Sequence, residues 1–271
     1  MKTVILPTLT ALALISCQRQ PAEVVVLGTV HQPVENYNAD SLYNILVRIQ
    51  PSVILCELDS SFFTETLTLK EQENGGNEYQ ATVRYAENFP VKVRPYEFEG
   101  RNGYRVEQGI RPTDGFVWRL LDSLYQQNKL TQDQRSIIDQ YYQLTDSLNG
   151  FALRGARAFN NKTTDEVAQQ RQQAQYQTLQ KITNQREEFT DRTHVRPNGQ
   201  PITYREAYRR AGAFWELRNQ TMARNILTVI KENPGARIVV LNGYYHRYYL
   251  RSELEGRQQE RNFVLKDYYD Y

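Results

Sequence analysis

Short runs rich in apolar residues, separated along the chain, predict the strands of a sheet. The first two cover 24–27 (VVVL) and 52–58 (SVILCEL), and a third short strand is expected at 91–94. The fourth covers 236–241, and the last, 262–266 (NFVLK), predicts an edge strand. Because the longer runs are continuous rather than alternating, they are typical of parallel strands that are buried on both faces.

The segment between the first two strands predicts a helix. It begins near Asp40, an N-cap candidate, and Pro51 ends it. Its apolar residues recur at helical spacing: Leu42, Ile45, Leu46 and Ile49. The order strand, helix, strand favours a parallel pair joined by a right-handed crossover.

From about residue 112 to residue 192 the pattern predicts a helical insertion. Its glutamine-rich part, 166–189, keeps an intermittent apolar stripe and predicts one long and rather polar helix. Loop residues follow at 194–201 (HVRPNGQP). Thr203 and Glu206 then form a capping-box pattern for a helix that runs to about Lys231.

Together these elements predict an α/β fold with a mixed, largely parallel central sheet. Two halves, each with a strand that leads into a Gly-x-x-His motif, flank the helical insertion, and a pseudo-twofold is expected to relate them. We expect residues 23–271 to form a single domain, because the helices come between strands of one sheet.

The N-terminus has the pattern of a secretory signal, since Lys2 precedes an apolar stretch that is too short to span a bilayer. Leu14 to Cys17 resembles a bacterial lipobox, which predicts a signal peptide at 1–16, a lipidated Cys17 and a polar tether at 17–22. The alternative is an ordinary cleaved signal with a chance cysteine. The lipobox predicts an exported protein that a lipid anchor holds at the bacterial membrane, facing the periplasm or the cell surface.

Composition argues against two other classes of protein. The chain has 33 Lys and Arg against 31 Asp and Glu, a formal net charge of +2, so no nucleic-acid partner is expected. Cys56 is the only cysteine besides Cys17, which excludes a disulfide framework.

The candidate chemistry lies where three predicted strands end. Gly28 precedes His31 by three residues, Gly243 precedes His246 in the same way, and Glu57 lies at the end of the second strand. In open α/β sheets, ligands bind at the carboxyl ends of the strands. Two imidazoles and a carboxylate are a sufficient set of ligands for a divalent transition metal (Mn, Co or Zn) with open positions. A lone histidine after a strand is more often a loop residue, but the repeated context favours a shared site.

The helix before the fourth strand adds two further candidates. Arg218 and Asn219 point about 100 degrees apart, so one of them is expected to face the crevice, where an arginine binds a carboxylate or an oxyanion. The alternative for Arg218 is an ordinary surface cation. Tyr244 and Tyr245 either wall a ligand pocket or pack beneath the following helix.

Four ordered motifs resemble one known family. They are GTVH at 28–31, ELD at 57–59, RNQTMARNI at 218–226 and NGYYH at 242–246. This set is similar to the TraB/PrgY/GumN family, which includes the TIKI proteases and belongs with the erythromycin esterase and ChaN-like proteins. The resemblance covers the first forty and the last sixty residues of the mature chain, approximately, and leaves out the helical middle.

The resemblance implies an α/β fold with paired Gly-x-x-His motifs and, in TIKI-like members, a metal-dependent peptidase activity. Carried over by motif, the metal ligands are His31, His246 and Glu57, and the further catalytic residues are Arg218 and Asn219. Glu57 also counts as catalytic because it would hold or activate a metal-bound water. Arg218 would stabilise the developing oxyanion.

Two departures from the family pattern concern the site. Relatives commonly place glutamate directly before Arg-Asn, where this chain has Leu217 with Glu216 one step earlier. After the second histidine they commonly have a small, glycine-containing stretch, where this chain has 247–249 (RYY). This second departure is expected to fill the mouth of the crevice with rings and leaves the substrate class open.

Two functions of different classes follow. The first is a metal-dependent hydrolase of the cell envelope, most simply a peptidase and next an esterase, with Tyr244, Tyr245, Gly28 and Gly243 beside the substrate. The second is a non-catalytic lipoprotein that binds haem or a peptide, since the ChaN-like relatives bind haem. A metal centre requires both histidines and the carboxylate to converge, whereas a binding groove does not. A third reading, an interaction role for the helical insertion, rests only on its polarity.

Overall fold

The computed structural model describes residues 20–73 and 75–271, and the predicted signal peptide and Cys17 lie outside them. Its strands form a five-stranded sheet and a separate two-stranded hairpin. The strands are β1 (Ala22–Thr29), β2 (Val53–Cys56), β3 (Lys92–Pro95), β4 (Thr193–Val195), β5 (Pro201–Thr203), β6 (Arg237–Gly243) and β7 (Phe263–Lys266).

Helices make up most of the remaining chain. They are α1 (Ala39–Ile49), α2 (Asn77–Asn88), α3 (Arg101–Glu107), α4 (Thr113–Gln126), α5 (Gln132–Ala152), α6 (Ala156–Phe159), α7 (Lys162–Gln173), α8 (Gln180–Gln185), α9 (Glu188–Asp191), α10 (Tyr204–Glu232), α11 (Tyr244–Glu255) and α12 (Gln258–Arg261). Short 3-10 turns lie at η1 (Ser60–Phe62) and η3 (Tyr268–Asp270), and one π-helical turn lies at η2 (Ala174–Thr178).

The five strands of the central sheet are all parallel, in the order β3, β2, β6, β1, β7. The predicted α/β class with a central parallel sheet is therefore confirmed, and the last strand lies at an edge as expected. The two strands that lead into Gly-x-x-His motifs are direct neighbours in the sheet, where β1 pairs with β6. The expected pseudo-twofold between the two halves stays a prediction.

Alternate residues of the strands face two different layers of helices. Val25 and Leu27 of β1 pack in one apolar cluster with residues of α1 and α2. Val24 and Val26 of the same strand face a second cluster with α10 and α11. Because both faces of the sheet are covered, its strands are apolar in continuous runs, which is why the sequence pattern located them.

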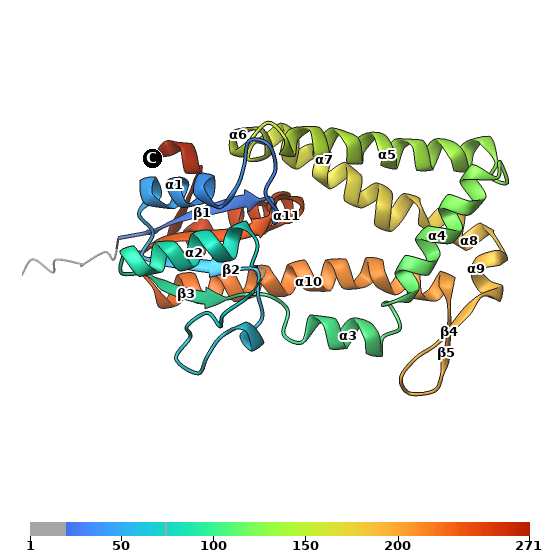
Figure 1. Ribbon diagram of the computed structural model, residues 1–271, viewed down its shortest axis with the longest axis horizontal. Coiled ribbons are helices and arrows are strands. Elements are labelled where there is room, and N and C mark those ends of the chain that lie inside the picture. The colour runs from blue at the N-terminus through green and yellow to red at the C-terminus, as the bar shows by residue number, and fades with distance from the viewer. Residues whose placement is uncertain (1–19, 74) are drawn as a thin grey trace, which may run out of the picture.

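The helices from α4 to α9 form an arm, of which α4, α8, α9 and most of α5 extend away from the sheet while α6 lies against the end of β1 (Figure 1). They have an apolar cluster of their own, in which Leu121, Ile138 and Phe189 are fully buried and Tyr208 of α10 takes part. Two side-chain hydrogen bonds attach this arm to the end of β1, since Asn160 accepts from the Gly28 N–H (2.7 Å) and donates to the Gly28 carbonyl (2.9 Å).

Several local predictions are corrected. The N-cap of α1 is Asn38, whose side chain accepts from the Ser41 N–H, and not Asp40. The expected loop at 194–201 lies within the β4–β5 hairpin. The long polar helix contains the π turn η2 and ends at Gln185. At α10, Thr203 accepts from the Glu206 N–H, which is one half of the predicted capping box, while the Glu206 carboxylate pairs with Arg209 and Arg210.

No helix within the described part of the chain is both long and apolar enough to cross a membrane.

Candidate functional site

The site lies where β1 and β6 end side by side, with Thr29 paired with Gly243 in the sheet register. His31 follows β1 after one further residue, and His246 lies in the first turn of α11. The two Gly-x-x-His motifs therefore place their histidines together at the carboxyl ends of the strands, as predicted.

Each glycine of these motifs makes room for the other motif. A Cβ at Gly243 would lie 3.0 Å from Nε2 of His31, and a Cβ at Gly28 would lie 2.9 Å from Cβ of Tyr244. A real Cβ atom does not tolerate the second contact, and the first forces the ring to move. The glycines are therefore required for the close approach of the two strand ends.

A buried arginine lies at the centre of the site. Arg218 of α10 is 8% exposed, and its Nε donates to both carboxylate oxygens of Glu97, at 2.9 and 3.1 Å. Its Nη2 donates to Oε1 of Glu57 at 2.5 Å, and its Nη1 donates to Nε2 of His246 at 2.7 Å. Arg101 donates to the second oxygen of Glu97 at 3.0 Å, so two cations face two carboxylates and the cluster is electrically balanced.

His246 is held as a neutral imidazole. Its Nε2 accepts from Arg218, and its Nδ1 lies 2.6 Å from Oδ1 of Asn219 and donates to it. The orientation of the Asn219 amide is fixed because its Nδ2 donates to the Trp215 carbonyl. The Trp215 ring stacks on the imidazole, with centroids 4.3 Å apart. Burial and the adjacent Arg218 charge lower the pKa of His246 to about 3.

Glu57 is an ionised carboxylate despite its burial. Its Oε2 accepts from the Gly243 backbone N–H at 2.7 Å, while Oε1 faces Arg218. Burial alone would raise the pKa of Glu57, but the surrounding positive charge and the backbone donor lower it to about 2. Glu57 therefore stays charged across the physiological pH range.

His31 has the opposite environment from His246. Its side chain is 63% exposed, and its Nδ1 lies 2.7 Å from Oε1 of Glu78. The hydrogen bond to this carboxylate raises the pKa of His31 to about 9, although burial of part of the ring opposes the shift. Thr29 also donates to Glu78 and fixes the carboxylate from the strand side.

The backbone of α2 explains how Glu78 reaches His31. Asn77, the first residue of α2, donates from its backbone N–H to the His31 carbonyl at 2.8 Å, and its side chain donates to the Val30 carbonyl at 2.7 Å. Gly76 also lies close to the His31 carbonyl, since a Cβ at Gly76 would be 2.3 Å from the His31 carbonyl oxygen. These contacts fix the start of α2 against β1 and place Glu78 next to the imidazole.

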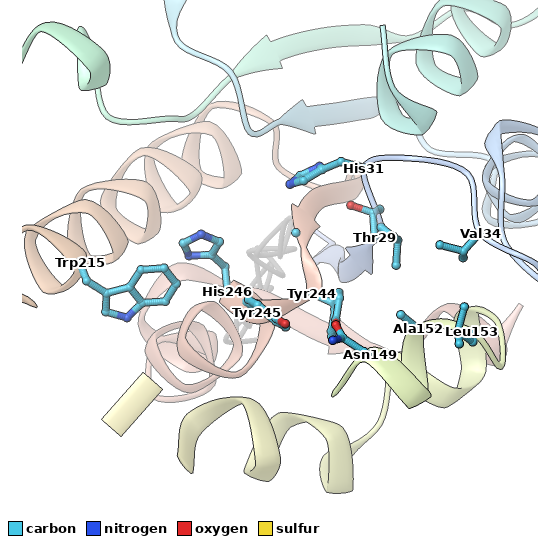
Figure 2. A pocket seen from close by; sticks show the side chains of 12 residues that line it. Thr29, His31, Val34, Asn149, Ala152, Leu153, Trp215, Tyr244, Tyr245 and His246 are labelled. Carbon is cyan, nitrogen blue, oxygen red and sulfur yellow. The ribbon is translucent and has the colours of Figure 1, made fainter. Parts of the chain in front are cut away.

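A cavity of about 520 Å³ opens beside the two histidines. His31 and His246 lie along its wall with Thr29 and Gly243. The other lining residues are Val30, Val34, Trp215, Tyr244, Tyr245 and three residues at the end of α5, Asn149, Ala152 and Leu153 (Figure 2). Tyr244 serves both roles that the sequence left open, because its hydroxyl also donates to the Leu148 carbonyl and its ring packs in the core.

The predicted metal ligands do not fit a metal in this arrangement. The lone pair of His246 Nε2 and one oxygen of Glu57 both accept from Arg218, so a fixed cation already occupies the space between them. The other oxygen of Glu57 accepts from Gly243. Of the three predicted ligands, His31 alone keeps a ring nitrogen for a metal, because Glu78 engages only its Nδ1. Within residues 20–73 and 75–271, no three His, Cys, Asp or Glu side chains are grouped as metal ligands.

Some expectations about individual residues are wrong. Arg218 and Asn219 both face the site, because the ring of His246 presents one nitrogen to each of them. Arg218 is not a surface cation, and it does not line the cavity. Residues 247–249 do not line the cavity: Arg247 is buried and paired with Asp165 and Asp267, and the hydroxyl of Tyr249 donates to Glu216.

Three residues of the site were missed in the sequence: Glu97, Glu78 and Trp215. Glu97 comes two residues after β3, and Glu57 comes directly after β2, so the position of Glu97 near a strand end was an available signal. Trp215 lies one helical turn before Arg218 and Asn219. Glu78 lies on α2, for which no motif was recognised, and its position depends on the contacts of the preceding Asn77.

Comparisons of the chain with protein-family models, with curated proteins and with solved structures find no match.

Proposed function

We propose that the protein is a hydrolase of esters or amides in which His31 is the general base. The observation that carries this proposal is the pairing of His31 with Glu78, which engages Nδ1 at 2.7 Å while the ring lines the cavity. An imidazole held by a carboxylate through one nitrogen is a common arrangement for proton transfer at the other nitrogen.

The proposed reaction is the attack of water on a carbonyl carbon. Nε2 of His31 takes one proton from the water as its oxygen bonds to the carbon, and Glu78 balances the charge of the imidazolium. The same proton then passes to the leaving oxygen or nitrogen as its bond to the carbonyl carbon breaks. The products are a carboxylic acid and an alcohol or amine, and no other reactant is consumed.

Arg218 acts here as a positioning residue and not as the oxyanion donor expected from the sequence. Its contacts with Glu97, Glu57 and His246 hold these groups at the strand ends. His246 is proposed to line the substrate cavity as a neutral ring. The TraB-like resemblance of the four motifs is consistent with a hydrolase, and the pattern at 1–17 supports a lipid-anchored protein of the cell envelope.

The test is a panel of p-nitrophenyl esters and of amides of amino acids, assayed with the mature chain and with His31→Gln. We expect hydrolysis that His31→Gln reduces on the order of 10²-fold or more. His194→Gln, on β4, is the matched control and should leave the rate unchanged. Equal rates for His31→Gln and the unaltered chain would overturn the assignment of the base.

The second candidate is a non-catalytic lipoprotein that binds a ligand in the same cavity. The observation that favours it is the apolar wall formed by Val30, Val34, Ala152 and Leu153. This candidate predicts ligand binding without turnover of any substrate in the panel.

A further inference from the structure

His31 separates two cavities of different character. The first is the apolar cavity of about 520 Å³, and the second has a volume of about 240 Å³ and includes Glu57, Glu78 and Arg101 in its wall. Among the residues described, His31 is the one that lines both. A group that reacts at His31 is therefore placed between an apolar and a polar surface.

The larger cavity is suited to an uncharged, apolar group. No Asp, Glu, Lys or Arg of the described chain lines it, so a charged group inside it would lack a counter-ion apart from His31 at its edge. Leu153, directly after α5, is 47% exposed and so offers apolar surface at this cavity. Figure 2 shows Ala152, Leu153 and Val34 grouped on the side of the cavity away from Trp215.

The smaller cavity has charged and polar groups in its wall beside Leu58, Leu69 and Leu241, and its charges are already paired. Glu57 faces Arg218, Glu78 faces His31, and Arg101 donates to Glu97. The amides of Gln32 and Gln72 and the hydroxyl-bearing ring of Tyr79 also line it. A charged group would meet no unpaired opposite charge there, whereas hydroxyl or amide groups would find hydrogen-bond partners.

We infer that the substrate is an uncharged amphiphile whose scissile ester or amide lies at His31. Its acyl chain or ring occupies the larger cavity, and its hydroxyl- or amide-bearing leaving part occupies the smaller one. This inference rests on the proposed hydrolase function, because it assigns the two arms on either side of the bond that His31 attacks.

The kinetic test uses p-nitrophenyl esters from acetate to octanoate. We expect kcat/KM to rise with chain length, by up to about fourfold per methylene until the cavity is filled. Leu153→Glu should flatten this dependence, while Val195→Glu, at an exposed position on β4, should preserve it. For the polar arm, octanoyl glycerol should be hydrolysed with a higher kcat/KM than ethyl octanoate. A rate independent of chain length, or equal rates for the two octanoyl esters, would overturn the inference.

A binding measurement separates this inference from the proposed function. The chain has two tryptophans, so Trp118→Phe leaves Trp215 in the cavity wall as the only one. Fluorescence of this variant is titrated with 1-butanol and 1-octanol. Tighter binding of octanol without turnover of any ester would support the apolar cavity and overturn the hydrolase. Turnover without preferential binding of octanol would do the reverse, and the absence of both would overturn both.

Discussion

The imidazole of His31 occupies the space that a side chain at Gly243 would need. A Cβ on Gly243 would lie 3.0 Å from Nε2 and 3.3 Å from Cε1 of this ring. The glycine of the second motif therefore determines where the histidine of the first motif can lie. At φ −53° and ψ 128°, Gly243 has a backbone conformation that alanine adopts without strain, so the relationship can be tested by substitution.

Gly243→Ala is expected to reduce ester hydrolysis about tenfold with little loss of stability. The added methyl group displaces the ring of His31 by a few tenths of an ångström, and small misplacements of a reacting group are costly. The measurement is kcat/KM for the best ester together with the urea midpoint of unfolding.

Gly28→Ala is the matched comparison. It is expected to reduce stability more than it reduces ester hydrolysis. Its Cβ would meet Cβ of Tyr244 at 2.9 Å and the Tyr244 Cα at 3.1 Å, so backbone must move. We expect a loss of about 1–3 kcal/mol in the free energy of unfolding. Equal effects of the two alanine substitutions on stability and on activity would contradict the distinct roles of the two glycines.

Glu78→Gln is expected to lower the pKa of His31 from about 9 towards the ordinary value near 6.5. A general base must be unprotonated, so kcat/KM of the unaltered protein should rise with pH up to about 9. In Glu78→Gln the inflection should move to lower pH, and the plateau should fall because the ring loses its orientation. Proton NMR titration of the three histidines measures the pKa directly, with His31→Gln to assign the resonance.

The raised pKa of His31 also makes the stability of the folded protein depend on pH. Its folded-state pKa lies above the unfolded value, so its contribution is fully present below about pH 6.5 and is lost as pH rises through about 9. Glu87→Gln, at an exposed position of α2, is the control for Glu78→Gln. It should leave the pH dependence of kcat/KM and of stability unchanged. An activity that falls between pH 7 and 9 in the unaltered protein would show that His31 does not act as the base.

The sequence predicted the strands and their carboxyl ends because each strand is buried on both faces and is therefore apolar without interruption. It could not reveal that Arg218 and Asn219 act together. Their side chains leave the helix in different directions, and the ring of His246, which meets both, comes from a different element. Likewise, the carboxylate of Glu78 reaches His31 only because Asn77 fixes the start of α2 to the backbone after β1.

The sequence also did not show which contacts the expected metal ligands make with other side chains. Convergence of His246 and Glu57 was predicted from the strand ends, and the structure brings them together, with Nε2 and Oε1 3.6 Å apart. The sequence did not indicate that the guanidinium of Arg218 lies against both. Residue types at strand ends identify which groups meet, but not which of their lone pairs remain available.

Arg218→Gln is expected to destabilise the protein by about 3–5 kcal/mol at pH 7.5, because it leaves Glu57 and Glu97 buried without their shared cation. Glu97 keeps its contact with Arg101, whereas the buried charge of Glu57 loses its arginine partner. Protonation relieves this charge, so the deficit should shrink when pH falls to about 4.5. Urea unfolding at the two pH values measures it.

Arg209→Gln is the control for this experiment. Arg209 lies on the same helix and pairs with Glu206, but its side chain is 60% exposed, so its loss should change stability by no more than about 1 kcal/mol. A deficit for Arg218→Gln that is the same at both pH values would show that uncompensated carboxylates are not its cause.

Finally, the arrangement of donors predicts that the protein does not retain a transition metal in stoichiometric amount. Arg218 donates to Nε2 of His246 and to Oε1 of Glu57, and a cation entering between them would have to displace the guanidinium. After incubation with manganese, cobalt or zinc and removal of free ions, elemental analysis should find far less than one metal per chain, and a chelator should leave ester hydrolysis unchanged. The first matched variant is Arg218→Gln, which frees Nε2 of His246 and Oε1 of Glu57. The second is the double substitution His31→Ala, His246→Ala. A near-stoichiometric metal in the unaltered chain that is lost from the double variant would refute this prediction and make a metal-bound water the nucleophile to consider in place of one activated by His31.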